Sequence, residues 1–360
     1  MNFIFTSSFK IQKSKLDIFR KGRKYIDICL QMKLLIKIIC LNYKNKKISV
    51  VIPIFNCQDS ILFVIRSIQN QNMFEIEIIL VNDHSSDDSL KIIRNIQKDD
   101  NRIIIINNKK NKGTFYSRSI GVLESKGEYI FPLDNDDMVL DRDVFDIVYN
   151  EAYNHNYDII GFKSVQVNNY NAKITEMRDG CHMHNKPFII YQDKLSLFGI
   201  SKNNRLRISE VHIWSKCIKS SIYKKAIDKL GVKRYSYFLV WGEDTSMVFI
   251  LFSFAESYRY IGKYGIFRFN RKSSASNTIS YSNKIFSKIF FLDILFDFTK
   301  NNSESKKFAI YQAINIRNSK FYNSLSKSNK NYLNLIIKKL LASNYINKKD
   351  KEKLLLMFFK

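Results

Sequence analysis

The stretch Tyr129–Asp137, with the sequence YIFPLDNDD, decides the fold class of this chain. Its first five residues are mostly apolar and predict a short buried strand, which the tetrad Asp134-Asn135-Asp136-Asp137 follows directly. A strand that ends in carboxylates brings hard oxygen ligands to the edge of a sheet, where a divalent cation and a phosphorylated substrate can meet. The stretch therefore favours nucleotide chemistry, and an ordinary solvated turn is the alternative that it leaves open.

Length and composition predict a folded protein with one large domain and basic extensions. The chain has 360 residues, of which 45% are hydrophobic, so it can bury a sizeable core. Its formal net charge of +26 is uneven, because residues 1–47 carry 12 basic and 2 acidic residues, and residues 261–360 carry 20 and 5. Residues 48–260 are balanced, with 27 basic and 26 acidic residues. The basicity therefore lies on the flanks and not around the acidic tetrad.

The two basic flanks leave several partners open. Clustered lysines attract the phosphates of anionic lipid or nucleic acid, or an acidic partner. The whole chain is rich in Lys, Asn and Ile, however, which indicates compositional bias. Residues 25–43 are apolar on average, but charged residues interrupt them, so no membrane span is predicted. We expect residues 1–47 to form a basic helical extension that lies on a membrane surface or packs on the domain.

The cysteines indicate a reducing, cytoplasmic location. There are 5 of them, widely spaced and without a Cys-x-x-Cys pair. The run Cys181-His182-Met183-His184 matches no common zinc spacing.

From residue 48 onward, short β-branched runs alternate with helical periodicity, and this alternation predicts a parallel sheet with right-handed crossovers. Ser85 and Ser86 are candidate caps of the second helix. The expected strands are 48–54, 76–81, 103–106, 129–133 and 158–167, and the expected helices are 61–68, 87–96, 114–125 and 143–154.

Polar residues follow each of the first four strands, namely Asn56, Asn82-Asp83, Asn107-Asn108 and Asp134. Each could form an ordinary turn. Because the carboxyl ends of parallel strands meet at one edge of a sheet, we expect all four groups to lie together and to form a site.

The second half of the chain is less regular. Residues 168–210 are polar and irregular, which is typical of a loop-rich acceptor region. Glu243 and Asp244 precede an apolar run that predicts a buried helix, and both could simply stabilise its N-terminus. We expect a strand at 264–269 and Lys-rich helices from residue 283 onward.

These patterns divide the chain into three parts. The expected parts are an extension at 1–47, an α/β domain at 48–280 with a nucleotide-binding half at 48–140 and an acceptor half at 141–280, and a basic helical region at 281–360.

With these residues in place, residues 48–276 resemble the family 2 glycosyltransferases, which are inverting enzymes of the GT-A fold that use nucleotide-diphosphate sugars. The chain departs from the family pattern at Phe55, where tyrosine is common, at His84, which replaces a glycine, and at Ser117 and Ser119. The five matching motifs, in order, are VVIPIFN at 50–56, VNDHSSDDS at 81–89, KGT to RSIG at 112–121, KGEYI leading into DNDD at 126–137, and WGED at 241–244.

The resemblance implies an α/β fold of the GT-A type, a Rossmann-like mixed sheet between flanking helices, with a C-terminal helical extension. It implies Mn2+ or Mg2+ at Asp136 and Asp134, with Asp137 a supporting residue or a helix cap. It makes Asp244 the general base, with Glu243 as the second choice. The residues that it places at the nucleotide sugar are Pro53, Phe55, Asn56, Asp83, Gly113, Arg118, Asp134 and Asn135, and those that it places in a lid over the diphosphate are Arg271 and Ser274.

The resemblance also implies partners. The donor would be a UDP-sugar, and the acceptor a hydroxyl of a glycan, lipid or protein, as in polysaccharide biosynthesis. The enzyme would work in the cytoplasm, with peripheral association at the cytoplasmic face of the membrane, and no specific nucleic acid is expected.

Other interpretations of the tetrad fit less well. An EF-hand loop that starts at Asp134 would have Met138, Val139 and Phe145 where oxygen ligands, glycine and glutamate are required. The chain lacks the later acidic motif of a haloacid-dehalogenase phosphatase. A nucleotidyltransferase of related fold is an alternative that the sequence leaves open. Two further alternatives are a catalytically inactive GT-A binding protein and a nucleic-acid or membrane binder that uses the basic flanks.

Overall fold

A computed structural model gives the structure of the chain. It describes residues 46–167, 178–179, 186–191, 198–200, 206–208, 212–232, 243–269, 289, 291–294, 313–314, 316–318, 322–323, 325–342 and 348–358. The chain divides into two compact units, Met1–Lys46 and Lys47–Lys360. The helix predicted for residues 1–47 and the lid residues Arg271 and Ser274 lie outside the described residues.

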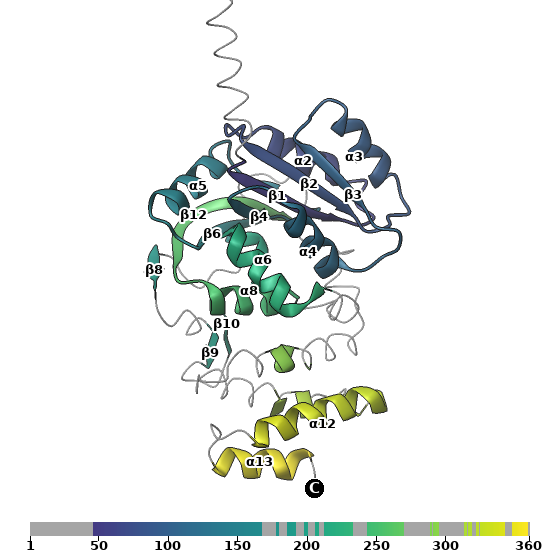
Figure 1. Cartoon of the computed structure of the whole chain (residues 1–360), viewed down its shortest axis with the longest axis vertical. Coiled ribbons are helices and arrows are strands. Elements are labelled where there is room, and N and C mark those ends of the chain that lie inside the picture. The colour runs from purple at the N-terminus through teal and green to yellow at the C-terminus, as the bar shows by residue number, and fades with distance from the viewer. Residues whose placement is uncertain are drawn as a thin grey trace, which may run out of the picture. The chain divides into compact units, whose positions relative to one another are not determined.

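Four parallel strands form one half of the main sheet, in the order β3-β2-β1-β4 (Figure 1). Helices connect consecutive strands, as the alternation in the sequence predicted. The strands are β1 (Ile48–Ile54), β2 (Ile76–Asn82), β3 (Ile103–Asn107) and β4 (Tyr129–Pro132), and the helices are α2 (Ile61–Gln69), α3 (Ser89–Gln97) and α4 (Thr114–Glu124).

Helices cover both faces of the sheet. Because successive side chains of a strand point to opposite sides, each strand contributes to the apolar cluster on either face. Val51 and Val81 pack with α4 in one apolar cluster, and Val50 and Ile52 pack with α2 and α3 in another. Helix α4 approaches very closely, because a Cβ at Gly121 would lie 2.5 Å from Cγ1 of Val51. These contacts fix the three-layer α/β/α arrangement.

The other half of the sheet makes it mixed. Strand β11 (Lys216–Lys219) runs antiparallel between β4 and β6 (Ile159–Val167), and β12 (Tyr258–Phe269) lies parallel to β6. Strand β5 (Met138–Val139) pairs with the end of β12. The sequence patterns missed β11 and placed the start of β12 six residues too late. The helices of this half are α5 (Val144–Asn154), the short η3 (Ile213–Ser215), α6 (Ser220–Leu230) and α8 (Glu243–Phe254).

The segment 168–210, which we expected to be irregular, contains short strands. β7 (Arg178–Asp179) pairs with β6, and β8 (Phe188–Ile190) pairs with β12. β9 (Phe198–Ile200) and β10 (Leu206–Ile208) pair with each other. The predicted loop-rich segment therefore also carries short strands among the residues that the structure describes.

Two helices lie near the C-terminus, α12 (Lys327–Ala342) and α13 (Lys348–Phe358), where Lys-rich helices were predicted. Asp293 is buried and accepts a hydrogen bond of 2.6 Å from the Tyr332 hydroxyl of α12. Among the described residues, none of the helices is both long enough and apolar enough to cross a bilayer.

Candidate active site

The polar residues that follow the parallel strands do meet at one edge of the sheet. Asn82 Nδ2 donates to Asn107 Oδ1 at 2.6 Å, and Asn108 Nδ2 donates to Asp83 Oδ1 at 2.8 Å. The ends of β2 and β3 are thus joined side chain to side chain.

Asp83 holds the turn that begins α4. Its Oδ1 accepts the backbone N–H of Lys112 at 2.9 Å, and its Oδ2 accepts that of Gly113 at 2.7 Å. Gly113 has a φ of 85°, a conformation that glycine adopts without steric cost. The nucleotide contact predicted for Asp83 would therefore add to three hydrogen bonds within the protein.

The loop after β1 is hydrogen-bonded to the loop after β2. The Ser85 hydroxyl accepts from the backbone N–H of Asn56 at 3.1 Å, and Asn56 Oδ1 accepts from that of Ser86 at 2.9 Å. These serines do not cap α3, which begins at Ser89, so their predicted capping role is wrong. At the predicted nucleotide pocket, Pro53 is buried within β1 and Phe55 is 45% exposed.

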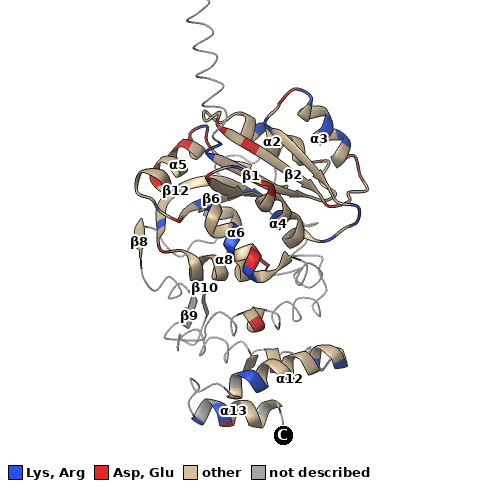
Figure 2. Ribbon diagram, in the orientation of Figure 1, with Lys and Arg blue, Asp and Glu red and all other residues tan. Residues whose placement is uncertain are grey.

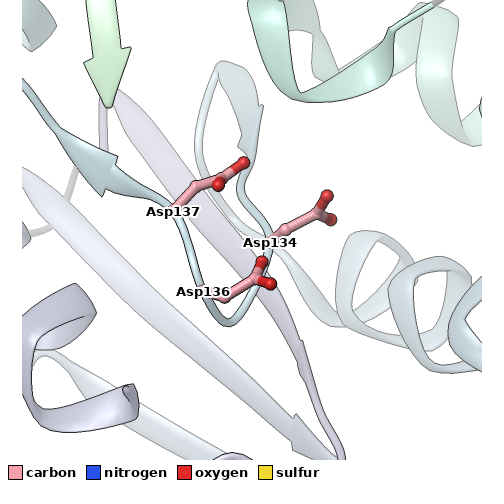
Figure 3. Close-up of side chains that lie close together, drawn as sticks. All are labelled: Asp134, Asp136 and Asp137. Carbon is pink, nitrogen blue, oxygen red and sulfur yellow. The ribbon is translucent and has the colours of Figure 1, made fainter. Parts of the chain in front are cut away.

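The acidic turn brings three carboxylates together. Ligand oxygens of Asp134, Asp136 and Asp137 lie within 4.8 Å of one another, and the three side chains project from one tight turn (Figure 3). Asp137 is buried and accepts the backbone N–H of Phe269 in β12 at 3.2 Å, so it does not cap a helix. Burial, and then the neighbouring Asp136 and Asp134, raise the pKa of Asp137 well above its usual range.

The turn fits a hard divalent cation. All three side chains offer oxygen, which Mg2+ and Mn2+ prefer. A cation there would relieve the repulsion that raises the pKa of Asp137. The prediction named Asp136 and Asp134 as ligands, and the structure adds Asp137 to the same cluster.

Asp244 comes from the first turn of α8 and reaches the acidic turn through Arg118 of α4. Arg118 Nη2 donates to Asp134 Oδ1 at 2.7 Å, and Arg118 Nη1 donates to Asp244 Oδ1 at 3.2 Å. One guanidinium therefore links the two acidic segments, although Arg118 and Asp244 are 126 positions apart in sequence.

Burial is the largest influence on the pKa values of Arg118, Asp244 and Glu243. Burial alone would lower the pKa of Arg118, whose side chain is only 6% exposed, but Asp244 and Asp134 raise it. Burial raises the pKa of Asp244 to about 8, against the opposing effect of Arg118. Glu243 and Asp134 also contribute to this rise, and the hydrogen bond with the backbone of Ile213 opposes it. Burial also raises the pKa of Glu243.

Comparison with known families agrees with this architecture. Residues 49–216 match the model of glycosyl transferase family 2. Residues 49–216 therefore form a glycosyltransferase domain of this family.

Curated relatives match the glycosyltransferase domain over short stretches. A GalNAc(5)-diNAcBac-PP-undecaprenol beta-1,3-glucosyltransferase of Campylobacter jejuni is 38% identical over 112 residues, which cover 30% of this chain and 36% of that protein. The poly(ribitol-phosphate) beta-N-acetylglucosaminyltransferase TarP of Staphylococcus aureus is 36% identical over 118 residues, 32% of this chain and 36% of TarP. The match thus spans about a third of each relative.

Solved structures extend the likeness of fold. TarS 1-349 of S. aureus, crystallised with UDP-GlcNAc, superposes with a TM-score of 0.63 at 13% identity, over 87% of this chain and 88% of TarS. The glycosyltransferase domain therefore has the GT-A fold that the sequence predicted.

Several residues that the sequence predicted for the site lie together at this edge of the sheet, but the sequence did not predict the contacts between them. Arg118 was predicted to lie at the nucleotide sugar, and the structure shows that it forms ion pairs with Asp134 and Asp244. The role of Ser60, whose hydroxyl donates to the Asn135 carbonyl at 2.9 Å, was missed. A serine that precedes a helix looks like an ordinary N-cap, so the sequence held no signal for this contact.

Proposed function

We propose that the chain is an inverting glycosyltransferase that moves a sugar from a UDP-sugar to an acceptor hydroxyl on a glycan or lipid. The observation that carries the proposal is the bridge from Asp134 through Arg118 to Asp244. It brings the acidic turn and a separate carboxylate to one site, as displacement from an anomeric carbon requires.

The donor would bind at the edge formed by the loops after β1, β2 and β4. Phe55 is exposed beside the hydrogen-bonded loops and offers a ring to the base. Asp134, Asp136 and Asp137 would hold Mn2+ or Mg2+, which acts as a Lewis acid on the departing diphosphate. Asp83 and Gly113 shape the turn before α4.

Asp244 would act as the general base. Its raised pKa makes it a stronger proton acceptor than an exposed carboxylate, which suits removal of a proton from an alcohol. Such a base typically contributes about 100-fold to 10,000-fold in rate. Arg118 would orient Asp244, because a planar guanidinium fixes the direction of a carboxylate.

The names of the relatives support the choice of substrates. One relative is named as a UDP-Glc:alpha-D-GlcNAc-diphosphoundecaprenol glucosyltransferase, and TarS was crystallised with UDP-GlcNAc. A UDP-sugar donor and an acceptor of the glycan or lipid-linked class follow by analogy. Work at the cytoplasmic face of the membrane would suit a lipid-linked acceptor.

A thermal-shift panel of nucleotide sugars, with Mn2+ and with chelator, tests the proposal. A donor at about 100 times its Kd should add about 2.7 kcal/mol of stability. We expect at least one UDP-sugar to raise the Tm only with Mn2+, and Asp136→Ala to abolish the rise. A panel in which no nucleotide sugar stabilises the chain, or in which chelator makes no difference, would overturn the proposal.

A further inference from the structure

The outer face of α3 carries a basic hollow beside the loop after β2. Lys91, Arg94 and Lys98 are spaced at i, i+3 and i+7, which places them on one side of the helix. The hollow has a volume of about 420 Å³, within the range of about 300 to 1,000 Å³ that is usual for small-ligand sites. Its lining residues are Ser85, Asp87, Leu90, Lys91, Arg94, Asn95 and Lys98.

The single carboxylate in the lining is already engaged. Asp87 Oδ2 accepts the backbone N–H of Gln58 at 3.0 Å, and Asp87 Oδ1 accepts that of Ser89 at 3.0 Å. The Ser85 hydroxyl accepts from Asn56, so its own proton can be donated elsewhere. The hollow therefore offers mainly hydrogen-bond donors.

The three cations keep most of their capacity for a ligand. Lys91 lies 3.8 Å from Asp88, and both side chains are about two-thirds exposed or more, so this pair is weak. Lys98 Nζ donates to Asn95 Oδ1 at 3.2 Å, which uses one of its three protons. Among the described residues, the Arg94 guanidinium has no hydrogen-bond or ion-pair partner. Arg94 is thus the strongest candidate to bind an anion.

We propose that this hollow is a second binding site, for a phosphate group. A guanidinium flanked by two ammonium groups matches phosphate oxygens in charge and in hydrogen-bond geometry. Lys109, Lys110 and Lys112 follow β3, and Figure 2 shows Lys and Arg on α3 and along the loop from β3 to α4. The positive charge therefore continues along this edge of the sheet.

The hollow shares Ser85 with the loop after β2 but does not include the acidic residues of the proposed sugar transfer. Its lining contains none of Asp134, Asp136, Asp137 and Asp244, and a cationic hollow binds phosphate without a divalent cation. Binding measured in chelator therefore separates the two sites, and failure of one proposal leaves the other standing.

Calorimetric titration of the full chain with inorganic pyrophosphate, in chelator and at fixed salt, tests the proposal. We expect binding that Arg94→Glu weakens at least about tenfold, because charge-assisted hydrogen bonds are lost. Arg94→Gln should weaken it less, since it removes the charge without reversing it. The matched control is Lys229→Glu, which makes the same change of charge at an exposed position of α6.

The outcomes decide both the site and the source of the phosphate. Equal affinity in Arg94→Glu and the wild type, or equal losses in Arg94→Glu and Lys229→Glu, would overturn the proposal. Flotation with phosphatidylglycerol vesicles forms the second arm. Loss of vesicle binding in Arg94→Glu alone assigns the phosphate to a lipid headgroup, and unchanged flotation with lost pyrophosphate binding assigns it to a soluble ligand.

Discussion

Arg118 is the residue on which the two acidic parts of the site depend. Its guanidinium is almost fully buried between Asp134 and Asp244, and Glu243 lies close enough to affect its pKa. Breaking a buried ion pair from one side leaves the other charge without compensation, which typically costs about 3 to 5 kcal/mol. The partial exposure of both carboxylates places this bridge at the lower end of that range.

Replacement of Arg118 should therefore destabilise the protein in a pH-dependent way. Arg118 opposes the rise in the pKa of Asp244, so its loss raises that pKa further. The folded state then keeps a proton that the unfolded chain, with an ordinary pKa of 3.8, releases. We expect Arg118→Met to lose about 3 kcal/mol at pH 9.5, where Asp244 is ionised in the folded wild type, and less at pH 6, where Asp244 is protonated in both folded proteins, by urea unfolding. Arg118→Lys should lose less at both values, and a loss independent of pH would contradict this account.

The pKa of Asp244 predicts the pH profile of turnover. A general base must be ionised, so kcat/KM should rise with pH through about 8 and then level off. A cation at the acidic turn favours the ionised form of Asp244. The increase of kcat with pH should therefore occur at a lower pH than the increase of kcat/KM. The check is a set of initial rates from pH 5 to 9.5 with saturating Mn2+. A flat kcat/KM above pH 6 would remove Asp244 as the base.

At the scale of elements, α2 holds the segment that follows β4. Ser60, which precedes α2, donates to the Asn135 carbonyl, and Ser67 Oγ accepts the backbone N–H of Val139 at 3.1 Å. Gln71 Nε2 donates to the Asp141 carbonyl at 2.6 Å. The loop after β1 and the acidic turn therefore share one support, which would set the spacing between the proposed nucleotide and cation.

Ser60→Ala should weaken donor binding more than it weakens the fold. Loss of one hydrogen bond costs about 1 kcal/mol, which corresponds to about a fivefold rise in the Kd for UDP with Mn2+. Ser67→Ala is the control, because it removes a comparable bond beyond the acidic turn. Calorimetry and Tm measured on both variants give the comparison. Similar changes in affinity for the two variants would show that Ser60 has no special role in positioning the turn.

The regular elements were predictable because their periodicity is strong. Strands β1 and β2 are buried throughout and rich in Ile and Val, and α2 buries one face through Ile61, Val64, Ile65 and Ile68. Strand β11 was not predicted because its sequence, KCIK, has lysine at both ends. Lys216 is nevertheless buried, and its ammonium group lies 2.8 Å from the His212 carbonyl oxygen. A short strand paired on both sides by distant segments leaves no local pattern.

At the scale of the whole molecule, residues beyond 280 join the core of the α/β domain. Phe249 of α8 packs edge to face against Phe291, with ring centroids 6.0 Å apart. Leu333, Ile336 and Leu354 of the last two helices belong to the same apolar cluster. The predicted boundary at 280 therefore stays a prediction, and the described residues beyond it contribute to the packing of α8.

Phe291→Ala tests this shared core. Removal of a buried phenyl ring should cost about 3 to 5 kcal/mol, because it leaves a cavity beside α8. Leu335→Ala, at a position of α12 that is 52% exposed, is the control and should change stability little. Urea unfolding measures both. Equal and small effects would indicate that the segment after 280 folds apart from the catalytic domain.

The residue types of the candidate site could be predicted from the sequence, but the contacts that bring them together could not. Carboxylates after a strand predicted the acidic turn, and the family motif around Glu243 predicted a second acidic group. The bridge through Arg118 depends on how α4 and α8 pack across the sheet, and residues 126 positions apart carry no mutual signal in one sequence. Tertiary structure alone shows that one guanidinium serves both carboxylates.

The most direct test of the account is the nucleotide affinity and the turnover of Asp244→Asn, measured side by side with a UDP-sugar and Mn2+. Asparagine keeps the size of the side chain and removes its capacity to accept a proton. We predict a Kd for UDP close to that of the wild type and a kcat lower by about 100-fold or more. Wild-type turnover in Asp244→Asn would contradict the claim that the two acidic segments act on one sugar.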